Sequence, residues 1–420
     1  MTTVVAHAAR SGIAALNVVT AALDSDARTR DVPVVFGKTR GELAAAIGAA
    51  RGPVVVAHSF YSTDARRAAE ELHALPRERV LHVAGGVHAT AEPLATLRAG
   101  FDVVIAGEGE AAFVELVAAV RDGRDPRGGI GTQWLDERGA LQRGPAAPRR
   151  PLDEFPAANL VHGRWNPLEI TRGCIYACSF CQTPFMFKAR FRHRSVDNVR
   201  AHVRAMVAGG LRYVRYVSPT SLSYGSDDTA VNLPAVEALL AAVRGELPPG
   251  GKQYFGTFPS EVRPEHVSAE ALALIARHAD NRSLVIGGQS GSERLLAATH
   301  RGHDVASIER AVALCAEAGF RADVDFLFGL PGETADDRAA TIALAERITA
   351  NGARVHSHAF MPLPGTPLAG AEPTQIAPDL ADAVARLESR GAAYGQWRAQ
   401  QKVAGELVQL RAAARGKATS

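Results

Sequence analysis

The segment TRGCIYACSFC, residues 171–181, is the most informative stretch of the chain. It follows a run at Leu168–Thr171 that predicts a β-strand, and it holds three of the four cysteines in the spacing C-x3-C-x2-C. Disulfide frameworks usually spread their cysteines along a chain. Three thiolates on one loop can instead hold three irons of a cubane, which leaves the fourth iron open to an outside ligand. The spacing therefore predicts a [4Fe–4S] cluster on Cys174, Cys178 and Cys181.

Two other metal sites use the same residue type and remain alternatives. Structural zinc also binds thiolates, but it needs four closed ligands, and the next histidine, His193, lies twelve residues beyond Cys181. A purely structural cluster would normally close all its positions as well. The fourth cysteine, Cys315, lies in an apolar helical run and is expected to be a core residue.

From about Pro167 onward, strand and helix patterns alternate six times in about 200 residues. This regularity predicts a partial parallel (β/α)6 barrel of the TIM type, in which chemistry lies on the loops after the strands. The expected strands are Leu168–Thr171, Tyr213–Val217, Gln253–Phe258, Ser283–Gly287, Arg321–Phe328 and Val355–Phe360. The expected helices include Val196–Ala208, Leu233–Arg244, Ala269–His278, Val305–Ala318 and Ala335–Ala350.

Upstream of the cysteines, five strand–helix units predict an open, doubly wound Rossmann-like α/β domain. The expected strands are Thr3–Ala6, Val32–Phe36, Val54–His58, Val80–Val83 and Val103–Ala106. The expected helices are Gly12–Leu23, Arg40–Ala50, Asp64–Ala74, Ala91–Arg98 and Ala111–Arg121. A stretch rich in Gly, Pro and Arg follows, with a hairpin expected from Thr132–Trp134 and Ala140–Gln142. We thus expect a Rossmann-like domain at 1–121, a linker at 122–160, a barrel at 161–370 and a helical extension at 371–420.

On these residues the chain resembles the radical S-adenosylmethionine (SAM) superfamily, whose signature is C-x3-C-x2-C after the first strand of a partial β/α barrel. The resemblance implies that the unique iron binds the amino and carboxylate groups of SAM, which is then cleaved reductively to a 5′-deoxyadenosyl radical. It implies SAM contacts on the cysteine loop and on the loops after the second, fourth and fifth strands, although the loop after the second strand departs from the usual Gly-Gly-Glu pattern. The implied residues are Phe180, then Ser218 and Pro219, then Gln289, Ser290 and Arg294, and last Gly329 and Leu330.

The first domain, residues 1–120, resembles the cobalamin-binding domain of B12-dependent radical SAM enzymes. Two glycine-containing strand ends about twenty residues apart carry this resemblance, and they imply cobalamin at the carboxyl edge of the sheet. The implied contacts are Ser59, Gly85, Gly86, His88, Gly107, Glu108 and Gly109. The Asp-x-His-x-x-Gly motif of B12 enzymes with a histidine ligand is absent. His88 as a structural residue, and a helix cap in place of the Ser59 contact, remain alternatives.

Composition gives no indication of a nucleic-acid or membrane partner. The chain has 420 residues, of which 47% are hydrophobic and 22% charged, with a formal net charge of +3. This balance does not predict binding to nucleic acid or to an anionic membrane. The sequence shows neither a signal-peptide pattern nor a membrane-spanning run, so the cytoplasm is the expected location.

The resemblance implies a cobalamin-dependent radical SAM methyltransferase that acts on an unactivated centre of a small molecule or peptide. It also implies an electron donor such as flavodoxin or ferredoxin. The alternatives are a radical SAM oxidoreductase, cyclase or rearrangement enzyme, and an iron–sulfur or cobalamin sensor. The pair His356 and His358, two residues apart on an expected strand, would share one face and look into the barrel. The sequence does not identify the substrate.

Overall fold

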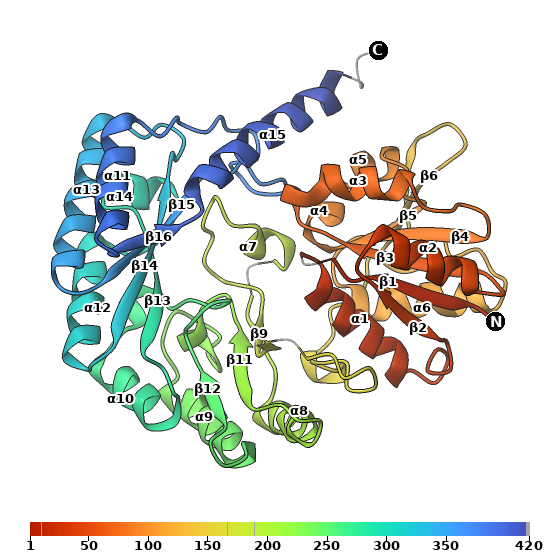
Figure 1. Cartoon of the computed structure of the whole chain (residues 1–420), viewed down its shortest axis with the longest axis horizontal. Helices are drawn as coiled ribbons and strands as arrows, with labels where there is room; N and C mark the ends of the chain where they lie inside the picture. The colour runs from red at the N-terminus through yellow and green to blue at the C-terminus, as the bar shows by residue number, and fades with distance from the viewer. Residues whose placement is uncertain (10, 166, 189, 417–420) are drawn as a thin grey trace. The chain divides into compact units, whose positions relative to one another are not determined.

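The computed structural model describes residues 1–9, 11–165, 167–188 and 190–416, the last four by their backbone alone. It divides into two compact units, Met1–Asn166 and Pro167–Ser420. The first unit is built on one mainly parallel sheet and the second on two parallel sheets, and helices pack along the sheets in both (Figure 1).

The sheet of the first unit has seven strands in the order β2-β1-β3-β4-β5-β6-β7. The first five strands are parallel, as the alternation of strands and helices predicts. They are β1 (Thr3–His7), β2 (Val34–Gly37), β3 (Val54–Ser59), β4 (Val80–Gly85) and β5 (Val103–Ile105).

Helices cover both faces of this sheet because its central strands are apolar on both sides. On one face, α1 and α6 pack on residues such as Val4, Val55 and Val103. On the other face, α2, α3, α4 and α5 pack on the alternate residues, such as Val5 and Val104. These helices are α1 (Ile13–Ser25), α2 (Arg40–Ala49), α3 (Ala65–His73), α4 (Gly86–Ala91), α5 (Pro93–Arg98) and α6 (Gly109–Arg121).

Two segments of this unit differ from expectation. The helix expected at Ala91–Arg98 forms as α5 and begins at Pro93, and a separate short helix that the sequence did not predict, α4, precedes it. Pro93 has no N–H to continue the helix from α4 and instead begins α5. The expected hairpin forms as β6 (Thr132–Leu135) and β7 (Leu141–Arg143), but it does not lie in a free linker. β6 pairs antiparallel with β5, so the hairpin extends the sheet of the first unit.

The second unit carries seven parallel strands in two sheets, one of three strands and one of four. β11 lies between β8 and β12, and β13 to β16 follow in chain order. A parallel bridge between Val262 and Ile286 connects the two groups. The strands are β8 (Leu168–Glu169), β11 (Tyr213–Val217), β12 (Lys252–Tyr254), β13 (Ser283–Gln289), β14 (Arg321–Phe328), β15 (Arg354–Ala359) and β16 (Ala393–Gly395).

The helices between these strands lie where the sequence predicts them. Ser195, Ser268, Asp304 and Thr334 each cap a helix with a side-chain oxygen that accepts a backbone N–H. The longer helices are α8 (Val196–Ala208), α9 (Leu233–Glu246), α10 (Ala269–His278), α12 (Val305–Glu317), α13 (Ala335–Ala350), α14 (Pro378–Ser389) and α15 (Trp397–Gly416), and the short ones are α7 (Gln182–Met186) and α11 (Glu293–Ala298).

The C-terminal segment is not wholly helical. β16 pairs parallel with β15 and adds a seventh strand that the sequence does not predict, because three residues are too few for a visible alternation. Figure 1 shows β13 to β16 side by side, with α12, α13 and α14 along their outer face. Within the described residues, no helix is both long and apolar enough to cross a membrane.

Candidate functional site

The three predicted cluster ligands lie on one loop of the second unit. A short antiparallel pair, β9 (Thr171–Arg172) with β10 (Arg192–His193), closes this loop at its base. Gly173 permits the closure, since its φ is +81° and a Cβ atom there would stand 2.1 Å from the Arg190 carbonyl oxygen. The loop therefore begins and ends at the same place, beside the barrel strand.

The cysteine side chains are withdrawn from solvent. Cys174 and Cys178 are buried, and Cys181 is the half-buried residue before α7. Burial, the largest influence, and the charges of the other two thiols raise the pKa of Cys174 to about 12. Burial also raises the pKa of Cys181, and the charge of Cys178 acts in the same direction. The three sulfurs thus lie near enough to sense one another's charge, as ligands of one cluster must.

A buried arginine contacts one of these sulfurs. Nη1 of Arg301 lies 3.3 Å from Sγ of Cys178, and its Nη2 donates to the Gly287 carbonyl at 2.5 Å. Glu261 lies on the same side, where burial raises its pKa to about 7 while Arg301 opposes that rise. A Cβ atom at Gly287 would come within 2.8 Å of both Arg301 and Glu261, so glycine makes this packing possible. Arg301 and Glu261 stood outside the predicted cofactor contacts, because neither lies within a glycine-rich strand end.

The loop after β11 carries buried hydroxyls that lack a hydrogen-bond partner among the described residues: those of Thr220, Ser221 and Ser223. The expected contact Ser218 is different, because its hydroxyl donates to the Thr220 carbonyl and its N–H donates to Ser260 Oγ, both at 2.9 Å. Pro219 beside it is half-buried. The hydroxyls of this loop that lack a partner among the described residues therefore lie one to five residues beyond the predicted contacts Ser218 and Pro219.

The loop after β13 is held mainly by its own contacts. Ser290 Oγ accepts from Ser292 N and lies 3.3 Å from Thr341 Oγ1. Arg294, expected to pair with a ligand carboxylate, forms an ion pair with Asp337. Although burial opposes it, hydrogen bonds from Arg294 and from other neighbours hold the pKa of Asp337 well below its usual range. Gln289 is buried with a positive φ of 72° at the strand end.

The loop after β14 joins the cysteine loop through apolar contacts. Leu330 and Phe360 form a buried cluster with Leu295, and Phe180 packs against that cluster. The two expected adenine-side residues, Phe180 and Leu330, therefore meet although 150 residues separate them. Gly329 takes a φ of +73°, and a Cβ atom there would stand 2.5 Å from the Thr374 carbonyl oxygen.

The two histidines expected to share a face do so. His356 Nδ1 lies 2.8 Å from Asp325 Oδ1 and 3.2 Å from His358 Nε2. Gln400 of α15 reaches the same group, since its Nε2 lies 3.3 Å from His358 Nδ1. Other basic residues near the cysteine loop form hydrogen bonds within the protein. Arg194 is buried and donates to Asn198, and His193 lies between Thr171 and the Ser226 carbonyl.

In the first unit, the expected cobalamin contacts gather at the carboxyl ends of β3, β4 and β5. Ser59 pairs with Gly85 across the sheet, and a Cβ atom at Gly86 would stand 2.7 Å from Ser59 Oγ. Gly107 has a φ of +88°, and a Cβ atom there would meet no atom within 4 Å. Glu108 and Gly109 follow at the start of α6. This edge combines close backbone packing at Gly86 with open space at Gly107.

His88 lies inside the domain. Its Nδ1 is 3.1 Å from Ser62 Oγ, and its ring lies against Phe60. Burial lowers the pKa of His88 to about 4. These contacts match the structural role that the sequence left open for this histidine.

Comparison with known proteins agrees with both units. The model of the radical SAM superfamily matches residues 168–345, and that of the B12 binding domain matches residues 12–117. The chain belongs to the radical SAM enzymes that carry a B12-binding domain. The radical SAM enzyme described here is 27% identical over 309 residues to an uncharacterized methyltransferase of Pyrococcus horikoshii, and 25% identical over 360 residues to an uncharacterized protein of Methanopyrus kandleri. These matches cover 69% and 72% of this chain but only 62% and 65% of the relatives.

Solved structures share the fold of this radical SAM enzyme. The methyltransferase TsrM from Kitasatospora setae, with cobalamin and a [4Fe–4S] cluster bound, superposes with a TM-score of 0.68 at 20% identity, over 87% of this chain and 76% of that chain. The cobalamin-dependent radical enzyme OxsB, with aqua-cobalamin bound, superposes with a TM-score of 0.65 at 15% identity, over 82% and 52%. At these identities the likeness concerns the fold alone.

The two family domains assign a [4Fe–4S] cluster, SAM and cobalamin to this radical SAM enzyme. Its residues fit all three. Three neighbouring thiols, two buried and one half-buried, suit the cluster, and the hydroxyls after β11 without a partner among the described residues suit a polar ligand such as SAM. The open space at Gly107 suits a large flat ligand at the sheet edge.

Proposed function

We propose that this radical SAM enzyme is a cobalamin-dependent methyltransferase that acts on an unactivated centre of a small molecule or peptide. The observation that carries the proposal is the presence in one chain of a C-x3-C-x2-C loop on a barrel strand and a glycine-containing B12 edge. The description of the Pyrococcus horikoshii relative as a methyltransferase supports it.

The cofactors, when bound, supply reductive cleavage of SAM and a methyl group carried on cobalt. The residues of the chain bind and orient these cofactors. Cys174, Cys178 and Cys181 hold the cluster, and the buried guanidinium of Arg301 supplies positive charge beside Cys178. The unpartnered hydroxyls of Thr220 and Ser221 offer hydrogen bonds to SAM. Phe180 and Leu330 offer an apolar wall for its adenine.

We further propose that a small electron donor such as flavodoxin or ferredoxin reduces the cluster, and that the reaction takes place in the cytoplasm. Reducing conditions keep free thiols available for iron, which suits a chain whose cysteines are all unpaired.

Product analysis under anaerobic conditions tests the methyl transfer. The purified chain is reconstituted with iron and sulfide and given reductant and SAM, with and without cobalamin. We expect 5′-deoxyadenosine together with S-adenosylhomocysteine, the latter only when cobalamin is present. If 5′-deoxyadenosine forms alone, with no S-adenosylhomocysteine whether or not cobalamin is present, the enzyme is an oxidoreductase, cyclase or rearrangement catalyst instead. Cleavage of SAM that persists in Cys178→Ala would contradict the whole assignment.

A further inference from the structure

Three buried histidines form a chain of contacts across the sheet of the first unit. His7, His58 and His82 lie on the adjacent strands β1, β3 and β4, on the face covered by α3. His7 Nδ1 is 3.1 Å from His58 Nδ1, and His58 Nε2 is 3.3 Å from His82 Nδ1. This series of histidine contacts ends at the Pro76 carbonyl oxygen, 2.9 Å from His82 Nε2. At the other end, His7 Nε2 is 3.4 Å from Glu71 Oε2.

The Pro76 carbonyl at one end of this series determines which ring nitrogen of each histidine carries the proton. Burial is the largest influence on all three rings and lowers the pKa of each, so each ring is neutral and carries one proton. A carbonyl oxygen only accepts, so His82 carries its proton on Nε2 and accepts at Nδ1 from His58. His58 then accepts at its own Nδ1 from His7. The remaining nitrogen, His7 Nε2, therefore presents a lone pair toward the Glu71 carboxylate.

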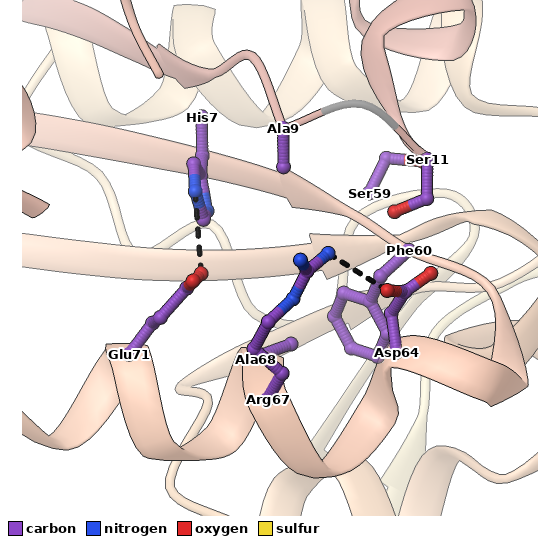
Figure 2. Close-up of a pocket in the computed structure, with 9 residues that line it drawn as sticks. All are labelled: His7, Ala9, Ser11, Ser59, Phe60, Asp64, Arg67, Ala68 and Glu71. Carbon is purple, nitrogen blue, oxygen red and sulfur yellow. Dashed lines mark hydrogen bonds and ion pairs between the residues drawn. The ribbon is translucent and has the colours of Figure 1, made fainter. Parts of the chain in front are cut away.

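Two acceptors 3.4 Å apart call for a donor between them. They stand in a small pocket lined by nine residues, drawn in Figure 2. Figure 2 shows His7 and Glu71 facing each other, and Arg67 beside them with its ion pair to Asp64. Donors are present too, because the buried Ser11 Oγ has no hydrogen-bond partner among the described residues. The pocket thus offers a fixed acceptor pair and donors within one small space.

Ser59 joins this pocket to the expected cobalamin edge. It lines the pocket, and its Oγ lies beside Gly86 at the start of α4. The ligand group that suits the pocket is neutral, with an N–H donor and a carbonyl acceptor. An anion would be repelled by Glu71 and Asp64, and a group with acceptors alone would leave His7 Nε2 unsatisfied. Cobalamin carries several groups of this kind, namely the primary amides at the edge of its corrin ring.

We propose that this pocket binds one peripheral primary amide of cobalamin, with the amide N–H directed at His7 Nε2 and Glu71 and the amide carbonyl directed at Arg67 or Ser11. The proposal rests on cobalamin as the cofactor of the first unit and not on methyl transfer. It makes the three histidines a device that holds His7 in the acceptor state.

Cobalamin derivatives in which one peripheral amide has become a carboxylic acid test the proposal. Hydroxocobalamin and each such monoacid are bound to the full chain with its cluster in place, and dissociation constants are measured by equilibrium dialysis. We expect one monoacid to bind at least about tenfold more weakly than the parent, a difference of ~1.4 kcal/mol, because a carboxylate has no N–H and meets Glu71. The other monoacids should bind within about threefold of the parent.

Two variants locate the effect. Glu71→Gln should bring the affected monoacid back to within about threefold of the parent, since the new amide can donate to the acid. His7→Phe should weaken binding of the parent itself and reduce the discrimination, while His202→Gln, in α8 of the second unit, should change neither. Equal binding of all monoacids to the unmodified chain, or discrimination unchanged by Glu71→Gln, would overturn the proposal while leaving methyl transfer untouched. Failure of hydroxocobalamin itself to bind would overturn the cofactor assignment and this proposal together.

Discussion

Arg301 donates toward the sulfur of Cys178 from inside the protein, with 3.3 Å between Nη1 and Sγ. Both residues are buried, so this contact is shielded from solvent and salt far better than a surface pair. Its closeness follows from the missing side chain at Gly287, which leaves room for Arg301 and Glu261. The position of one glycine on β13 thereby sets the charge beside a ligand on a loop 109 residues earlier.

Replacing Arg301 should lower the reduction potential of the cluster. A cation and an N–H donor beside a sulfur ligand favour the reduced, more negative state, so their loss disfavours reduction. For Arg301→Gln we expect a decrease on the order of 50–100 mV, with a smaller one for Arg301→Lys. Redox titration followed by electron paramagnetic resonance measures it, on samples matched for iron content. A potential that stays the same in Arg301→Gln would show that the contact has no electronic effect.

The four cysteines should separate cleanly by role. Alanine at Cys174, Cys178 or Cys181 removes one of three ligands, and we expect loss of the cluster and of SAM cleavage. Cys315→Ala should keep the iron content and cost about 1–2 kcal/mol of stability, because it opens a small cavity in the buried face of α12. Iron analysis and visible absorption distinguish the two outcomes. Full iron content in any of the three loop variants would exclude that cysteine as a ligand.

Alanine should have opposite effects at two glycines of the first unit, weakening cobalamin binding at one and raising stability at the other. A Cβ atom at Gly12 would stand 1.8 Å from the Ser59 carbonyl oxygen, so Gly12→Ala must displace the loop before α1 and should weaken cobalamin binding. Gly48 lies in α2, where a Cβ atom meets nothing within 4 Å, so Gly48→Ala should stabilise that helix by ~0.5–1 kcal/mol. Thermal unfolding and equilibrium dialysis measure the pair. Unchanged cobalamin affinity in Gly12→Ala would mean that this loop lies away from the ligand.

The first unit should loosen in mild acid. Burial lowers the pKa of His88 to about 4, against 6.5 for an ordinary histidine, so the folded state favours the neutral ring. The resulting stability is fully present above pH 6.5 and is lost as the pH falls from 6.5 toward 4, at ~1.4 kcal/mol per pH unit. Hydrogen exchange in peptides from β3 and β4, corrected for intrinsic rates, should show the loss. In His88→Gln the acid-dependent part should shrink, and a pH profile identical to that of the unmodified chain would argue against His88 as its source.

The order of elements could be predicted because the apolar patterns are strong. Most helices of the second unit, such as α8, α10 and α13, lie at the predicted residues, where capping side chains reinforce the pattern. The three cysteines were recognisable because their spacing is local. β16 and the placement of the β6–β7 hairpin depended on pairing with distant strands, which a local pattern does not record.

The same distinction applies to the side chains of the site. Phe180 and Leu330 each adjoin a recognisable motif, and the structure packs them in one cluster, while their contact with SAM stays a prediction. Arg294 was expected to bind a ligand, but Asp337 of α13 lies within reach of its guanidinium. The relay from His7 to His82 left no trace in the sequence, since its members lie 51 and 24 residues apart and meet only when the strands align.

The late position of β16 has a consequence for synthesis. β15 ends at Ala359 and its outer partner begins at Ala393, about 34 residues later along the chain. At ~5–20 residues per second, a ribosome needs about 2–7 s to produce that interval. During this time the outer edge of β15 exposes unpaired N–H and C=O groups, which can pair with another nascent chain. Translation speed between residues 360 and 395 therefore determines how long this edge stays exposed to aggregation.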